Sequence, residues 1–303
     1  MLKDGVQRWW SITRDAVRLW LDRNAFGLAG SLAFYTLFSL APVVIIAVSV
    51  IGVVLGEQAA HGEIVAQLQD LMGRDAAQAV ERAVASSRIQ ESGLLPTLLG
   101  AGALVIGATT VFAQMQYSLN TLWGVAARPS RSSVFVFLKA RLLSLTVVLA
   151  IGFVLLVSLL LGVVLRAVLH FTQRFVPEVA ALLSTAELLV SWLAMSLLFG
   201  AIFKVLPDVV LRWRDVIVGA LVTALLFSVG RYGIAAYLAY TATASTYGAA
   251  GSVVLILLWV YYSSLILLFG AAFTKTQLLA RGLAVVPRNS AVRVRRELVS
   301  DAD

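Results

Sequence analysis

The sequence predicts an all-α polytopic membrane protein, a helical bundle with about six transmembrane helices. Hydrophobic residues make up 60% of the 303-residue chain and charged residues only 13%. Soluble domains carry about 45–50% apolar residues and about 25% charged residues. Six apolar stretches approach or exceed the roughly 20 helical residues that cross about 30 Å of hydrocarbon. Basic residues between these stretches alternate from one side to the other. Because backbone amides in hydrocarbon must pair within their own segment, such stretches become helices.

The N-terminal segment, residues 1–26, predicts an amphipathic helix at the cytoplasmic membrane interface. Trp9, Trp10 and Trp20 lie among several arginines. Indole rings at headgroup level beside basic residues are typical of helices that lie in an interface.

The membrane domain is expected over residues 27–280. Its apolar stretches lie at about 27–56, 93–113, 142–165, 182–203, 216–240 and 251–274. Pro42 falls inside the first stretch, where a proline removes a helical hydrogen bond and allows a kink.

Two further segments lie outside the spans. In the external loop, residues 57–92, apolar side chains recur at helical spacing with acidic residues on the other faces, which predicts one or two amphipathic helices. We favour a cap packed on the bundle over a partner-binding surface. Residues 281–303 form a basic cytoplasmic tail, which we expect to be mobile after Pro287 and to touch anionic lipid.

The charge distribution predicts the orientation. The N-terminal segment, the second and fourth connections and the tail carry 18 basic residues, and the first and third connections carry five. Because basic loops are retained in the cytoplasm, both termini are expected there. The net charge of +8 then reflects topology, and nucleic acid is not an expected partner.

Catalytic and metal-binding patterns are missing from the sequence. There are no cysteines, so disulfides, thiol catalysis and thiolate metal sites are excluded. His61 and His170 lie far apart, and neither a phosphate-binding glycine loop nor an H-E-x-x-H motif is present. We therefore expect no enzymatic activity, no metal and no cofactor.

A polar stripe marks the first span. Ser31, Tyr35, Ser39 and Pro42 follow one another at helical spacing and share one face. Polar groups facing lipid are costly, so the stripe is expected to point into the bundle. It is either a wall of a polar pathway or a set of interhelical hydrogen bonds.

Two features of the fifth span and its following loop are further substrate-path candidates. Arg231 is a cation inside an apolar stretch, where it either binds an anionic substrate group or extends to the external headgroups. Residues 237–252 are rich in hydroxyls and carry no charge, with Tyr237, Tyr240 and Tyr247 among them. This segment is either a substrate gate or a tightly packed turn, and we favour the turn.

Three sequence blocks resemble one known family. They are SLAFYTLFSLAP at residues 31–42, YSLNTLW at 117–123, and a third block from 206 to 271 that contains Arg231, YGAAGS at 247–252 and LWVYYS at 258–263. In this order they resemble the YihY/BrkB family of bacterial inner-membrane proteins, once labelled ribonuclease BN. Asn120 of the second block joins the substrate-path candidates.

The resemblance implies six helices, a bacterial inner membrane and a role in the cell envelope, with movement of lipid or lipopolysaccharide as one activity. It also implies an acidic residue near Ser228 and Ala272 in many family members, and both positions are uncharged here. The RNA cleavage that the old label implies finds no catalytic residues in this sequence.

We therefore predict a protein that transports or flips a lipid or another amphipathic envelope molecule. A non-transporting scaffold for envelope assembly, or a regulatory membrane protein, is the alternative, and a membrane-associated ribonuclease is the least favoured. The expected partners are membrane lipids, including anionic or lipopolysaccharide-related ones, and the sequence is compatible with an oligomer.

Overall fold

The helical membrane fold is confirmed by the computed structural model, which describes residues 2–72, 77–78, 80–82, 84, 94–128, 177–240 and 249–294. The helices are α1 (Leu2–Asp22), α2 (Ala25–Leu55), α3 (Glu57–Met72), α5 (Leu94–Trp123), α7 (Pro177–Val205), α8 (Trp213–Tyr240) and α10 (Ala249–Ala280), and the strands are β1 (Val125–Ala127) and β2 (Ala291–Arg293).

Three described helices are long and apolar enough to cross a membrane, over Ala25–Ile46, Trp213–Arg231 and Val253–Ala280. Leu189–Val205 is a shorter apolar helical segment. The predicted stretch at 142–165 lies outside the described residues, so the count of six spans stays a prediction.

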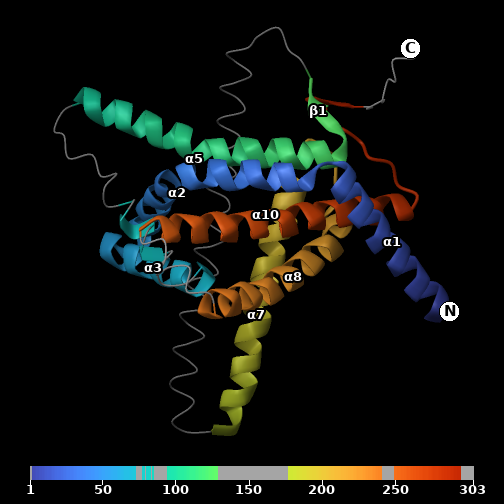
Figure 1. Ribbon diagram of the computed structural model, residues 1–303, viewed down its shortest axis with the longest axis horizontal. Coiled ribbons are helices and arrows are strands. Elements are labelled where there is room, and N and C mark those ends of the chain that lie inside the picture. The colour runs from blue at the N-terminus through green and yellow to red at the C-terminus, as the bar shows by residue number, and fades with distance from the viewer. Residues whose placement is uncertain are drawn as a thin grey trace.

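Helix α10 occupies the centre of the bundle. It packs against α1, α2, α5 and α8, and α7 packs against α8. Figure 1 shows α2, α5 and α10 running alongside one another, with α7 crossing them steeply. Fully buried side chains from three of these helices lie in the core, namely Leu119 and Leu122 of α5, Phe203 of α7 and Leu268 of α10. We call the end where α2 and α8 begin and α5 and α10 end the basic end, because Lys204, Arg212, Lys275, Arg281 and Arg288 lie there.

Helices α8 and α10 approach closely through two reciprocal glycine–threonine contacts. A Cβ on Gly219 of α8 would overlap Thr274 Oγ1 of α10, and a Cβ on Gly270 of α10 would overlap Thr223 Oγ1 of α8. Each threonine hydroxyl donates to the carbonyl four residues earlier, at 2.6 Å for Thr223 and 2.7 Å for Thr274. The hydroxyls are therefore paired within their own helices, and the small residues allow the two backbones to approach.

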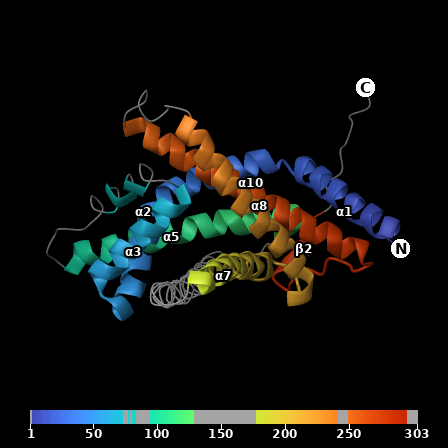
Figure 2. The same ribbon diagram turned by 90° about the horizontal axis from the view of Figure 1, so that it is seen from below.

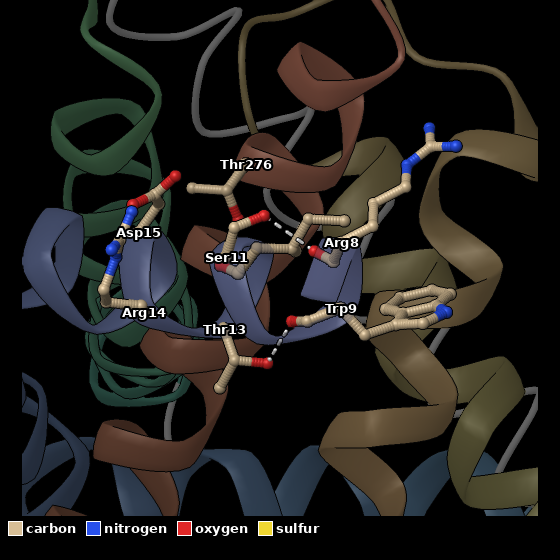
Figure 3. A network of polar contacts seen from close by, with 8 residues as sticks. Arg8, Trp9, Ser11, Thr13, Arg14, Asp15 and Thr276 are labelled. Atoms are coloured by element: carbon tan, nitrogen blue, oxygen red, sulfur yellow. Dashed lines mark hydrogen bonds and ion pairs between the residues drawn. The ribbon is translucent and has the colours of Figure 1, made fainter. Parts of the chain in front are cut away.

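Helix α1 lies along the last turns of α10 and runs in the opposite direction. Thr276 Oγ1 donates to Ile12 O at 3.4 Å, and Trp20 Nε1 donates to Leu265 O at 3.2 Å. Figure 3 shows Ser11 and Thr13 bonded back to their own helix with Thr276 beside them. Ile12 and Ala16 are buried, while the apolar side chains of Trp10, Val17 and Leu21 stay exposed. The apolar face of α1 is thus divided between α10 and the surroundings.

Helix α3 lies at the opposite end from the strands (Figures 1 and 2). Ile64 and Leu68 of α3, with Val80 and Val84, pack against a cluster that includes Val44 of α2 and further side chains of α10. The described part of the segment predicted to be the external loop is therefore helical and packed on the bundle.

The tail differs from expectation, because residues 285–294 are bonded to the basic end. Strands β1 and β2 pair antiparallel, with Val125 opposite Arg293 and Ala127 opposite Ala291. Val210 N donates to Val286 O at 2.8 Å, and Val294 N donates to Gly124 O at 2.9 Å. The expectation of a mobile chain directly after Pro287 is therefore wrong as far as Val294.

Candidate functional site

A partly open cavity of about 160 Å³ lies between five helices of the bundle. Counting 1.5 Å per helical residue, Thr36 lies about 16 Å from the start of α2, and Phe227 about 21 Å from the start of α8. A hydrocarbon core is about 30 Å thick, so this is mid-depth for a bundle that spans it. The lining residues are Leu32, Thr36, Val111, Met115, Phe199, Phe227, Trp259, Val260, Ser263, Ser264 and Leu267.

Aromatic rings from three helices form one wall of the cavity. Phe227 of α8 lies between Phe199 of α7 and Trp259 of α10, with ring centroids 5.7 Å and 5.5 Å away. Both pairs are edge-to-face, at interplanar angles of 62° and 74°, a geometry that favours the positive edge of one ring on the negative face of the other. This packing joins α7, α8 and α10 across the cavity.

The polar side chains that line the cavity, apart from the indole of Trp259, carry hydroxyls. Thr36 comes from α2, and Ser263 and Ser264 come from α10. Ser263 Oγ is buried and has no hydrogen-bond partner among the described residues. No charged side chain is found among the described residues that line the cavity. The site can therefore accept an apolar group and offer hydroxyl hydrogen bonds.

The predicted polar stripe of α2 does not line this cavity. Ser31 Oγ donates to Gly27 O of its own helix at 3.1 Å, and Ser39 is buried at 2% exposure. Tyr35 is 38% exposed, so the stripe does not point into the bundle along its whole length. Pro42 lies against α5, where a Cβ on Gly107 would be 2.8 Å from its Cγ.

Asn120 lies in a buried polar junction at the basic end. Its Nδ2 donates to Asp208 Oδ2 at 2.8 Å, and its Oδ1 accepts from Asp208 N at 2.8 Å. Gln116 Nε2 also donates to Asp208 Oδ2, at 3.2 Å, and Ser290 Oγ lies 3.5 Å from Oδ1. We call these four residues the Asp208 junction; it joins α5, the connection between α7 and α8, and the tail.

Arg231 is partly buried and lies one helical turn beyond Phe227 on α8. It is therefore near the cavity in sequence, although it does not line it. Tyr237 and Tyr240 belong to α8, and nothing is described of their side chains. Tyr247 lies outside the described residues. At the two positions that the family resemblance singled out, Ser228 Oγ donates to Ala224 O at 2.8 Å, and Ala272 is buried.

Sequence reasoning missed Thr36, Ser263, Ser264 and Asp208. Thr36 directly follows Tyr35, and Ser263 ends the LWVYYS block. A search for hydroxyls one face away from the named stripe could have found Thr36. No sequence signal distinguishes Ser263 from the other helical serines, because what sets it apart is the cavity beside it.

Comparison with known proteins gives a consistent identification. Residues 16–286 match the family described as virulence factor BrkB. A UPF0761 membrane protein from Rhodospirillum centenum is 28% identical over 88% of this chain and 57% of its own length. UPF0761 membrane proteins from Yersinia pestis and Yersinia pseudotuberculosis are 31% identical over 59% of this chain and 58% of theirs.

The chain therefore spans a little under three fifths of the length of these curated relatives. No solved structure matches the chain.

Proposed function

The chain belongs to the virulence factor BrkB family of membrane proteins, and we propose that it moves a lipid or another amphipathic envelope molecule across a bilayer. The cavity between α2, α5, α7, α8 and α10 is the observation that carries this proposal. Its position at mid-depth is where a molecule that crosses between leaflets must pass.

The cavity also separates the transport proposal from its alternatives. A scaffold for envelope assembly needs a packed interior and an exposed external surface, and it has no use for free hydroxyls inside the bundle. A nuclease needs clustered acidic ligands, and the described residues contain no group of three or more His, Asp or Glu that could hold a metal ion. The comparisons give no enzyme class, and the role we propose is not enzymatic.

We further propose that the protein lies in a bacterial inner membrane with the basic end in the cytoplasm. The support is the excess of arginine and lysine at that end. The chain has no cysteine, so a single introduced cysteine is labelled without background. With Asn289→Cys, which is exposed at the basic end, we expect a membrane-impermeant maleimide to react in inverted vesicles only. With Gln69→Cys, exposed on α3, reaction should occur on intact spheroplasts. The reverse pattern would invert the proposed orientation.

Filling the cavity is expected to slow lipid movement. Ser263→Phe places a large ring where a serine lines a cavity of about 160 Å³. We expect purified protein in liposomes to transfer fluorescent phospholipid between leaflets, and the variant to do so at least tenfold more slowly. The measurement is the rate at which a reductant outside the vesicles reaches label from the inner leaflet.

Val229→Phe is the matched control, because Val229 is 63% exposed on α8 and the added ring meets lipid instead of the cavity. Equal rates in both phenylalanine variants would remove the cavity from the pathway, and no lipid movement by the unmodified protein would end the transport proposal.

Arg231→Ala in the same lipid-transfer assay tests whether the charge of Arg231 contributes to lipid movement. A rate unchanged from the unmodified protein would assign Arg231 a structural role.

A further inference from the structure

The hydroxyls of the cavity differ from most of the helical hydroxyls that the structure describes. Serine and threonine in apolar helices commonly donate to the carbonyl of the preceding turn. Ser31, Ser196, Thr223, Ser228 and Thr274 all do so, at 2.6 to 3.1 Å. Thr36, Ser263 and Ser264 make no such bond in the described parts of the chain, although Ser264 is only 8% exposed and Ser263 Oγ is buried.

An unpaired buried hydroxyl is costly, and Ser263 Oγ is such a hydroxyl at the cavity. Leaving a buried donor unpaired costs about 1–3 kcal/mol, and a bond to the helix carbonyl is the usual remedy. Thr36, Ser263 and Ser264 line the same cavity, from α2 on one side and α10 on the other, whereas Ser118 Oγ on α5 is buried without a partner in the described chain and lies outside the cavity. This arrangement fits a ligand that supplies a hydrogen-bond acceptor between the two helices.

The described lining favours an uncharged acceptor. Apart from the three hydroxyls, the described lining side chains are apolar or aromatic, and no arginine, lysine or histidine is among them. A phosphate or carboxylate placed there would lose its hydration without a counter-charge, which is strongly unfavourable in an apolar site. A neutral carbonyl loses far less and can accept hydroxyl hydrogen bonds.

The size of the cavity restricts the ligand further. Its volume is about 160 Å³, close to that of an engineered apolar cavity of about 150 Å³ that binds benzene. A short segment of acyl chain with its linking carbonyl is of this size. The edge-to-face rings of Phe227 and Trp259 give such a segment an apolar wall.

We propose that this cavity binds the ester-linked end of a lipid acyl chain, with Thr36, Ser263 and Ser264 as hydrogen-bond donors to the ester carbonyl. The inference rests on the proposed function, because it names the part of the lipid that the transport site recognises. The charged headgroup stays outside the cavity, and selectivity is for the linkage between chain and headgroup. A lipid whose chains are attached by ether bonds lacks the carbonyl and binds more weakly.

The experiment uses Trp259 as a reporter of cavity occupancy. The full chain is reconstituted in vesicles that contain phosphatidylcholine with bromine atoms a few carbons from the linkage, either ester- or ether-linked with identical chains. Bromine quenches tryptophan fluorescence on contact. The chain has seven tryptophans, so the signal of Trp259 is the difference between the unmodified protein and Trp259→Phe. The quenching of Trp259 is plotted against the mole fraction of brominated lipid. Comparing the curves for the ester and ether lipids gives the relative affinity of the cavity for the two.

We expect the unmodified protein to favour the ester lipid about fivefold, as one or two neutral hydrogen bonds would give. Ser263→Ala with Ser264→Ala should bring the ratio close to one, and Thr36→Val should lower it in part. Ser196→Ala is the matched control. Its hydroxyl bonds to Trp192 O at 2.8 Å outside the cavity, so the ratio should be unchanged.

The outcomes distinguish failure of carbonyl recognition from failure of the proposed lipid transport. Equal quenching of Trp259 by the two lipids overturns carbonyl recognition and leaves lipid binding in place. A preference for the ester lipid that persists in the double serine variant also overturns carbonyl recognition by these hydroxyls, because another group must then bind the carbonyl. Absence of any Trp259 quenching by either lipid overturns lipid binding in the cavity, and the proposed function with it.

Discussion

Gly219→Ala is expected to lower the melting temperature of the purified protein by roughly 5–10 °C. The new methyl group would overlap Thr274 Oγ1 and lie 3.1 Å from Thr274 Cβ and 3.2 Å from Gly270 O. The carbonyl belongs to the backbone of α10 and the threonine is fixed at χ1 by β-branching, so relief requires α8 and α10 to move apart. That movement also disturbs the reciprocal contact between Gly270 and Thr223 on the same two helices.

A double variant and a matched control test this mechanism. Thr274→Ala removes the overlapping hydroxyl, so Gly219→Ala combined with Thr274→Ala should recover much of the lost stability. Gly233→Ala on the same helix is the control, because a Cβ there meets no atom within 4 Å, and alanine favours helix by about 1 kcal/mol over glycine. The measurement is the fraction that remains monodisperse in detergent after heating. Equal losses from Gly219→Ala and Gly233→Ala would contradict close packing of α8 on α10.

Asp208→Ala is expected to destabilise the basic end by about 3 kcal/mol and to release the tail. The substitution removes the acceptor of Asn120 Nδ2 at 2.8 Å and of Gln116 Nε2 at 3.2 Å. Hydrogen bonds to a charged group contribute about 1.5–3 kcal/mol each, and a buried donor left without a partner adds a penalty. The carboxylate also contacts the tail, because Ser290 Oγ lies 3.5 Å from Asp208 Oδ1, and the neighbouring backbone bond from Arg288 N to Asp208 O depends on the position of the connection between α7 and α8.

Limited proteolysis measures the release directly. Arg288 and Arg293 are trypsin sites in the segment that pairs with β1 and the α7–α8 connection, and cleavage there should become at least tenfold faster in Asp208→Ala. Asp15→Ala removes the same charge from an exposed carboxylate, paired with Arg14 at 3.4 Å on the surface, and it should leave cleavage unchanged. Similar cleavage rates in the two variants would show that the Asp208 junction does not hold the tail.

Hydrophobic length predicts the apolar helices well and their polar extensions poorly. The second apolar stretch ends near residue 113, yet α5 continues to Trp123. The polar residues that end the apolar run include Gln116 and Asn120, whose side chains are paired with Asp208. A hydropathy pattern cannot show that pairing, because Asp208 lies 88 residues from Asn120.

The pairing of the tail and the position of the cavity also depend on contacts between residues far apart in the sequence. Strands of three residues, such as β1 and β2, carry no alternating pattern that sequence reasoning could detect, and a basic segment after a proline is typical of a free tail. Among the hydroxyls, spacing identified Ser31, Tyr35 and Ser39 as one face of α2. It could not identify Thr36, because the position of the cavity depends on where α10 and α8 meet α2.

Entry of lipid into the cavity is the central claim, and mapping the sites of photolabelling tests it most directly. The unmodified protein is reconstituted with a phospholipid that carries a diazirine on its acyl chain, irradiated, and digested for mass spectrometry. Lipid-facing residues such as Leu225, 55% exposed on α8, should be labelled in any membrane helix. We predict adducts on the cavity-lining residues Met115 and Ser264 as well. Adducts confined to the lipid-facing residues would contradict lipid entry.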